Sequence, residues 1–210
     1  MKYILFFSLF FTSTLFAQND YYDDRYDDME EYEFESIFRA YIAAGLNIAQ
    51  IRGDGWGGYN KVGGNIGVGT YIMFEDFVSM SMEIGYSMRG AQQFFGGSGN
   101  PAIPNQRLVT DYIQIPVQAH YHNDKFGVFG GGLNLGYLVR KKYINAISPG
   151  RLDNIKPFDL SFVASYTYII KENFGVNLTF NYSLSNNINS PLRRGGWYHN
   201  VLSLRGYYLF

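Results

Sequence analysis

Residues 174–185, FGVNLTFNYSLS, decide the fold class because apolar and polar side chains alternate along the whole stretch. The apolar set is Val176, Leu178, Phe180, Tyr182 and Leu184, and the polar set is Asn177, Thr179, Asn181, Ser183 and Ser185. Successive side chains of a β-strand point to opposite faces, so this period of two predicts a strand with one apolar face.

Eight segments of this kind follow one another along the chain. We expect strands at residues 38–48, 61–74, 78–89, 111–122, 126–138, 157–170, 174–185 and 200–210. The fifth segment is the least regular, because it contains the run Gly130-Gly131-Gly132. Short turns alternate with long loops between the segments, and an even number of strands connected in this way is typical of outer-membrane barrels.

The composition of the polar face separates a membrane barrel from a soluble one. A water-facing surface carries many Lys and Glu residues, whereas this face holds mainly Ser, Asn, Thr, Gln and Gly, with isolated charges at Glu83, Asp159 and Arg205. Small uncharged polar residues suit a crowded lumen, and the aromatic residues near the strand ends suit interfacial belts. The sequence therefore predicts an all-β fold, an eight-stranded antiparallel up-and-down transmembrane β-barrel in a bacterial outer membrane.

The N-terminal part predicts export. Lys2 precedes an apolar run that ends at Ala17, as in a cleaved signal peptide, and the chain has no cysteine. Residues 18–37 hold nine acidic residues and one base, Arg25, whereas the rest of the mature chain is basic. Such a charge run is usually a solvated, disordered tail, but docking to a basic periplasmic partner or weak divalent-cation binding stays open. We expect a signal peptide at 1–17, an acidic segment at 18–37 and the barrel at 38–210.

Two motifs resemble the PorT-like outer-membrane β-barrel proteins of bacteria with type IX secretion. They are Ala44-Gly45-Leu46-Asn47, followed by a polar loop and Tyr59-Asn60-Lys61, and Tyr112-Ile113-Gln114-Ile115-Pro116-Val117. The resemblance covers about residues 41–210. It implies a barrel fold and, less directly, an accessory role in type IX secretion with a periplasmic or secretion-system partner.

No constellation of residues predicts catalysis or a cofactor. His120 and His122 share one strand face with a spacing that can chelate a metal, but two ligands do not make a site. His199 is the histidine expected at the outer rim, and no motif fixes an acid or a serine beside it. We therefore expect no enzyme, no metal, no cofactor and no nucleic-acid partner; a lipid-modifying enzyme is the least favoured alternative.

Two structural expectations concern the strands themselves. Glu83 and Arg205 lie near the middle of their strands on the polar face, so we expect an ion pair across the narrow lumen. Pro116 lacks a backbone N–H, so we expect a β-bulge at this residue.

The charges of the long loops and strand tops are strongly biased. We assign eleven bases to this end of the barrel: Arg52, Lys61, Arg89, Arg107, Arg140, Lys141, Lys142, Arg151, Lys156, Arg193 and Arg194. Only Asp54, Asp111 and Asp153 oppose them. We hypothesise that Arg140, Lys141, Lys142, Arg193 and Arg194, with Trp197 at the membrane interface, bind lipopolysaccharide phosphates.

The functional expectation is correspondingly coarse. An eight-stranded lumen is filled by side chains, whereas water-filled porins need about sixteen strands. We expect a non-catalytic outer-membrane barrel with a structural, adhesive or assembly role at the cell surface, in contact with outer-membrane lipid and lipopolysaccharide. The alternative is the accessory role in type IX secretion.

Overall fold

The computed structural model describes residues 38–93, 105–123, 125–144, 155–171, 173–187 and 196–210. The expected signal peptide, the acidic segment and the pair Arg193 and Arg194 lie outside these residues. The strands are β1 (Phe38–Arg52), β2 (Lys61–Glu75), β3 (Val78–Gln93), β4 (Gln106–Asn123), β5 (Gly127–Ile144), β6 (Phe158–Lys171), β7 (Phe174–Ser183) and β8 (Tyr198–Leu209). No helix in this part of the chain is long and apolar enough to cross a membrane.

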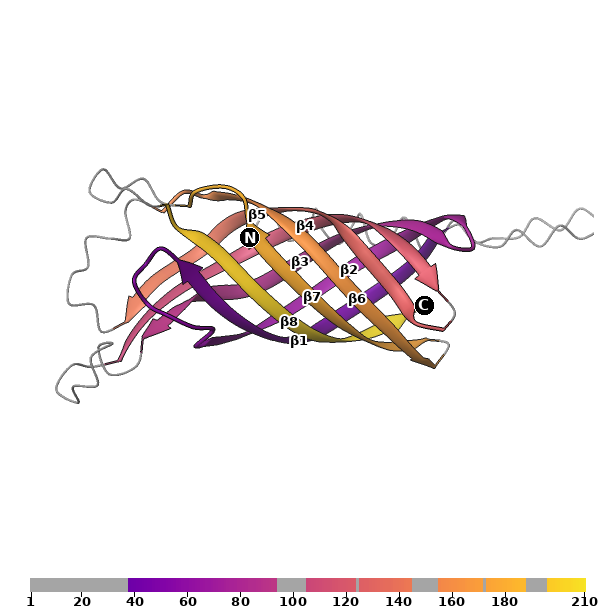
Figure 1. Ribbon diagram of the computed structural model, residues 1–210, viewed down its shortest axis with the longest axis horizontal. Coiled ribbons are helices and arrows are strands. Elements are labelled where there is room, and N and C mark those ends of the chain that lie inside the picture. Colours follow the sequence, from indigo (N-terminus) through magenta and orange to yellow (C-terminus); the bar gives the residue numbers. More distant parts are fainter. Residues whose placement is uncertain (1–37, 94–104, 124, 145–154, 172, 188–195) are drawn as a thin grey trace, which may run out of the picture. The chain divides into compact units, whose positions relative to one another are not determined.

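The eight strands form one closed antiparallel barrel in which each strand pairs with its neighbours in sequence (Figure 1). The barrel closes where β1 pairs with β8, from Tyr41 opposite Leu209 to Arg52 opposite Tyr198. The predicted fold class is confirmed. We call the end with the short connections β2–β3, β4–β5 and β6–β7 the turn end, and the opposite end, with the long connections, the loop end.

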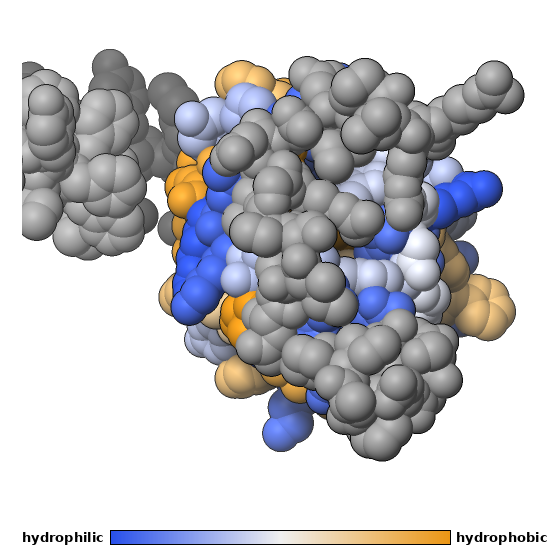
Figure 2. All heavy atoms as spheres, turned by 90° about the vertical axis from the view of Figure 1, so that its left-hand side faces the viewer, coloured by the Kyte–Doolittle hydropathy of each residue, from blue (hydrophilic) through white to orange (hydrophobic). Residues whose placement is uncertain are grey.

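Exposure along each strand shows which face points outward. On β7, Leu178 is 43% exposed while the next residue, Thr179, is 5% exposed. On β3, Ile84 is 57% exposed while Glu83 is 1% exposed. Apolar side chains cover the outside and polar side chains fill the inside, the reverse of a soluble barrel. Figure 2 looks onto the loop end and shows hydrophilic residues around the mouth, with hydrophobic residues on the flanks.

Five strands extend further toward the loop end than the sequence pattern predicts. Strand β1 continues to Arg52 and β8 begins at Tyr198. Strand β3 continues to Gln93, β4 begins at Gln106 and β5 continues to Ile144. The Gly130-Gly131-Gly132 run lies within β5, which pairs on both sides through these residues. Position 132 requires a glycine, because a Cβ there would clash with the carbonyl oxygen of Val117 on β4.

The expected bulge at Pro116 is wrong. The pairs on either side, Met82 with Val117 and Gly85 with Gln114, keep the same offset between β3 and β4, and between them Pro116 and Ile115 are left out of this ladder. Proline removes a hydrogen-bond donor, which interrupts the ladder without inserting a residue. The irregularity between β4 and β5 falls instead at Asp111 and Tyr112, closer to the loop end.

Candidate functional site: the lumen and the two ends of the barrel

The first ion pair crosses the lumen from β3 to β8. Arg205 Nη1 donates to Glu83 Oε1 at 2.7 Å and to Oε2 at 3.0 Å. Arg205 Nε also donates to Asn177 Oδ1 at 2.9 Å, and the Tyr41 hydroxyl donates to Glu83 Oε2 at 3.1 Å. The structure thus brings together the two residues that the sequence pattern placed on the polar face. Both charges are buried and both are hydrogen-bonded, which offsets part of their desolvation cost.

A second ion pair lies closer to the loop end, and we did not expect it. Arg89 Nη1 donates to Asp159 Oδ2 at 2.8 Å, and the two side chains are 1% and 0% exposed. Asp159 Oδ1 accepts hydrogen bonds from Ser183 Oγ at 2.5 Å and from Asn187 Nδ2 at 3.0 Å. The guanidinium carbon of Arg89 lies 5.1 Å from the centre of the Tyr112 ring, in cation–π range.

Arg89 and Lys61 lie toward the loop end, as expected, but both side chains are buried and add no exposed charge to that end. Arg89 and Lys61 are each 1% exposed. Lys61 Nζ donates to the carbonyl oxygen of Val62 at 2.8 Å. The alternation on β3 already placed Arg89 on the same face as Glu83, so the period-two pattern was the signal that could have identified it.

Side chains close the lumen at both ends. At the turn end the ring of Tyr41 stacks on Tyr207 at 4.5 Å and lies 5.1 Å from Tyr71. At the loop end an apolar cluster fills the mouth; it consists of Ile51, Ala91, Leu108, Ile155 and Trp197. Between these layers, a cavity lined in part by Gln118 and Arg205 has a volume of about 10 Å³, room for about one water molecule.

Each histidine lies inside the barrel. His120 and His122 contact Ser81 and Ser79 through their Nε2 atoms, at 2.7 Å and 2.6 Å. His199 is 2% exposed, so it lies in the lumen and not at the outer rim. Its Nε2 lies 3.4 Å from the Tyr112 hydroxyl. In a catalytic triad the histidine stands between serine and carboxylate, whereas here the serine hydroxyl of Ser183 donates directly to Asp159.

The residues of the lipopolysaccharide hypothesis fall into different environments. Trp197 is 5% exposed within the apolar cluster of the mouth, so its expected position at the membrane interface is wrong. Arg140, Lys141 and Lys142 are exposed on β5. Arg140 Nη1 lies 3.7 Å from Asp111 Oδ2, and the Arg140 side chain is 59% exposed.

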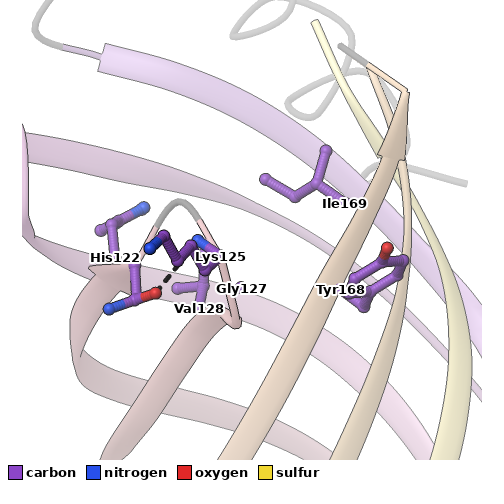
Figure 3. Close-up of a pocket in the computed structure, with 7 residues that line it drawn as sticks. His122, Lys125, Gly127, Val128, Tyr168 and Ile169 are labelled. Atoms are coloured by element: carbon purple, nitrogen blue, oxygen red, sulfur yellow. Dashed lines mark hydrogen bonds between the residues drawn. The ribbon is translucent and has the colours of Figure 1, made fainter.

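A pocket opens at the turn end, between the β4–β5 turn and the end of β6 (Figure 3). Its volume is about 330 Å³, and its lining includes His122, Lys125, Tyr168 and Ile169. Figure 3 shows His122 and Lys125 beside the turn, with Tyr168 and Ile169 across from them on β6. The pocket combines the basic side chain of Lys125 and the imidazole of His122 with an apolar wall.

A closed eight-stranded barrel with an apolar outer belt and a polar, side-chain-filled interior defines an integral outer-membrane β-barrel protein. The family described as "Outer membrane protein beta-barrel domain" matches residues 16–189. This match covers most of the chain, so the protein belongs to that family, and it resides in the outer membrane. Comparison with curated proteins found no match.

Solved structures of outer-membrane barrels are similar in fold. The crystal structure of Ail, the attachment invasion locus protein of Yersinia pestis, gives a TM-score of 0.51 at 13% identity, covering 82% of this chain and 98% of Ail. Ail in a phospholipid bilayer nanodisc gives 0.46 at 14% identity, with coverage of 82% and 99%. AlkL in lipid bilayers gives 0.37 at 14% identity, with coverage of 91% and 96%. At these identities the likeness concerns the fold alone.

Proposed function

We propose that the protein is a non-catalytic barrel that does not conduct and that acts through its surface at the loop end, in an adhesive, structural or assembly role. The observation that carries this proposal is the filled lumen. Among the described residues, two buried ion pairs cross it, and a cavity between them has a volume of about 10 Å³. A barrel whose lumen is filled by side chains does not conduct solutes, so it interacts with other molecules through its two ends and its lipid-facing wall.

Single-channel recording on the full chain in planar bilayers tests the closed lumen. We expect no stable conductance steps, because the ion pairs and the apolar mouth leave no continuous water path. A reproducible ohmic channel would contradict the proposal. Detergent-matched bilayers without protein are the control for membrane leakage.

The orientation of the barrel can be tested on intact cells. Outer-membrane barrels direct their long loops outward and their short turns to the periplasm. A membrane-impermeant amine reagent should therefore label Lys142 near the loop end and leave Lys125 at the turn end unlabelled until the cells are opened. Labelling of Lys125 alone would reverse the orientation and remove the surface role.

A second candidate is an accessory role in type IX secretion, as the PorT-like motifs suggest. The turn-end pocket favours it, because Lys125 would face the periplasm, where a partner with acidic groups could dock. Deletion of the gene followed by measurement of secreted proteins on the cell surface tests this role. The deletion strain is complemented with Lys125→Glu or with Lys142→Glu. If Lys142→Glu restores delivery and Lys125→Glu does not, the result favours the secretion role over the surface role.

The attachment function named for Ail belongs to that protein, and only the shared fold connects it with this chain. An adhesive role here rests on the closed lumen and on the basic loop end.

A further inference from the structure

The loop-end part of the β4–β5 hairpin stands above the rest of the wall. Pairing between β5 and β6 ends with Tyr137 opposite Phe158, whereas pairing between β5 and β4 continues to Ile144 opposite Arg107. Among the described residues, β5 beyond Tyr137 is therefore paired with β4 and not with β6. Arg140, Lys141 and Lys142 lie on this projecting segment.

The pairing register assigns the three bases to two different faces, because residues directly opposite each other share a face of the sheet. Arg140 lies opposite Asp111, and Lys142 lies opposite Val109. Lys141 lies opposite Thr110, which is two residues from Tyr112 on β4 and so shares the lumen face on which Tyr112 contacts Arg89.

The face of Arg140 and Lys142 is the lipid-facing one. The Tyr86 hydroxyl donates to Asp111 Oδ2 at 2.8 Å. Tyr86 continues the row of Ile84 and Met88, which are 57% and 39% exposed on the outside of β3. Asp111 therefore lies on the outside, and with it Arg140.

Asp111 orients Arg140 without occupying all of its donors. Asp111 Oδ2 accepts from Tyr86 and lies 3.7 Å from Arg140 Nη1. A guanidinium has five N–H donors in a planar fork, and 59% of this side chain stays exposed. Donors therefore remain for a second anion on the outer side of Arg140.

The height of this face on the barrel matches the lipid headgroups. Three residues before Arg140, Tyr137 is 50% exposed on the outside and packs edge-on against Phe158, with ring centres 5.2 Å apart. Such outward aromatic pairs lie at the membrane interface. At about 3.3 Å per residue, Arg140 lies roughly 10 Å further along the strand, where headgroup phosphates begin.

We propose that the outward face of this hairpin binds the phosphorylated headgroup of an outer-leaflet glycolipid, with Arg140 and Lys142 as ligands and Asp111 as the residue that positions Arg140. Arginine binds phosphate through paired hydrogen bonds, and lysine adds a point charge beside it. The ligand is part of the membrane and not a soluble anion, because the face lies directly above the aromatic belt. The proposal rests on the orientation given above, with the loop end outside the cell, and not on an adhesive, structural or assembly role.

The opposing explanation is that the three bases only protect the projecting edge of β5 from pairing with other chains, as charged residues often do on edge strands. That explanation makes Lys141 as important as Lys142, since both lie on the same edge. Glycolipid binding separates them, because only Lys142 shares the outward face with Arg140. Lys141 thus provides a matched control of equal charge one residue away.

The test uses the full chain in nanodiscs that contain either bisphosphorylated lipid A or dephosphorylated lipid A. The measured quantity is lipid A bound per barrel, by mass spectrometry, at low and at high salt. The variants are Arg140→Gln with Lys142→Gln, Lys141→Gln alone and Asp111→Asn. Migration before and after boiling verifies that each variant is folded.

We expect the double variant to retain roughly three- to tenfold less phosphorylated lipid A, from two screened ionic contacts. Lys141→Gln should keep the wild-type level, and Asp111→Asn should lower retention while Lys142 still contributes. High salt should lower wild-type retention toward that of the double variant.

Three results would overturn the proposal. An equal loss in Lys141→Gln would indicate edge protection, and equal retention of dephosphorylated lipid A would exclude phosphate recognition. Equally tight binding of a soluble polyanion, such as inorganic polyphosphate, to nanodiscs without lipid A would assign the face to a soluble ligand.

Discussion

At the residue scale, the two cross-lumen ion pairs are the features on which the interior depends. Removal of one partner from a buried pair leaves the other charge without compensation, which costs about 3–5 kcal/mol. Arg205 is 5% exposed and, among the residues that the structure describes, would keep Asn177 and Thr179 as hydrogen-bond partners if Glu83 were removed. We therefore expect Glu83→Ala to lower the free energy of unfolding by about this amount.

The double variant Glu83→Ala with Arg205→Ala should lose less free energy of unfolding than the sum of the single variants. Each single variant leaves one unpaired charge, whereas the double variant leaves none. Denaturant unfolding in detergent micelles gives the four free energies of the cycle. Glu75→Ala, at the exposed turn end of β2, is the control for loss of a carboxylate. Additive losses would mean that the pair seen in the lumen has no energetic coupling.

The sequence allowed one ion pair to be anticipated and not the other, for a physical reason. Glu83 and Arg205 fall near the centres of their predicted strands, where the period of two is unambiguous. Arg89 stood at the last residue of a predicted strand, and strand ends are the least certain part of a sequence pattern. Because β3 continues to Gln93, Arg89 lies inside the wall and points to the lumen.

At the element scale, β5 shows how glycines let side chains and neighbouring strands approach. A Cβ on Gly132 would meet the carbonyl oxygen of Val117 and lie 2.8 Å from Gln118 Cα, both backbone atoms of β4. A Cβ on Gly131, which points outward, would meet nothing within 4 Å. The two glycines are neighbours in one strand and differ in the face they occupy.

We expect Gly132→Ala to destabilise the barrel by about 1–3 kcal/mol, because the backbone of β4 must move to admit the methyl group. Gly131→Ala should be neutral or slightly stabilising, since alanine restricts the unfolded chain more than glycine does. The midpoint of urea unfolding in micelles measures both. Equal midpoints for the two variants would contradict the close contact between β4 and β5.

The glycine run shows no regular alternation, so the fifth strand could be placed only by its position between two strands with clearer alternation. Pro116 raised a different difficulty, because its missing backbone N–H predicted an irregularity in the strand but not whether this would be a bulge or a gap in the ladder. A missing donor can be accommodated by a bulge or by a gap in the ladder, and the choice depends on the neighbouring strand. Here β3 keeps its register and leaves a gap.

At the scale of the whole molecule, closure between β1 and β8 makes the barrel a single hydrogen-bonded unit. A closed barrel satisfies its backbone groups internally and leaves no edge, so it should resist detergent until it is boiled. We expect unboiled protein in dodecyl sulfate to migrate differently from boiled protein. Identical migration, together with recovery of the protein in the soluble periplasm, would contradict the membrane barrel.

A proline at the closing seam tests whether closure causes this resistance. Leu204 on β8 lies opposite Leu46 on β1 and opposite Leu178 on β7, and it is 58% exposed to the lipid side. Leu204→Pro removes a backbone donor from a strand that is paired on both sides and should abolish the unboiled folded band. Leu204→Ala changes the same lipid-facing position without removing the donor, so it should keep that band. A folded band in both variants would mean that the β7–β8–β1 ladder tolerates a gap, as the β3–β4 ladder does at Pro116. Detergent resistance would then depend on the packed lumen and not on unbroken pairing between β8 and its neighbours.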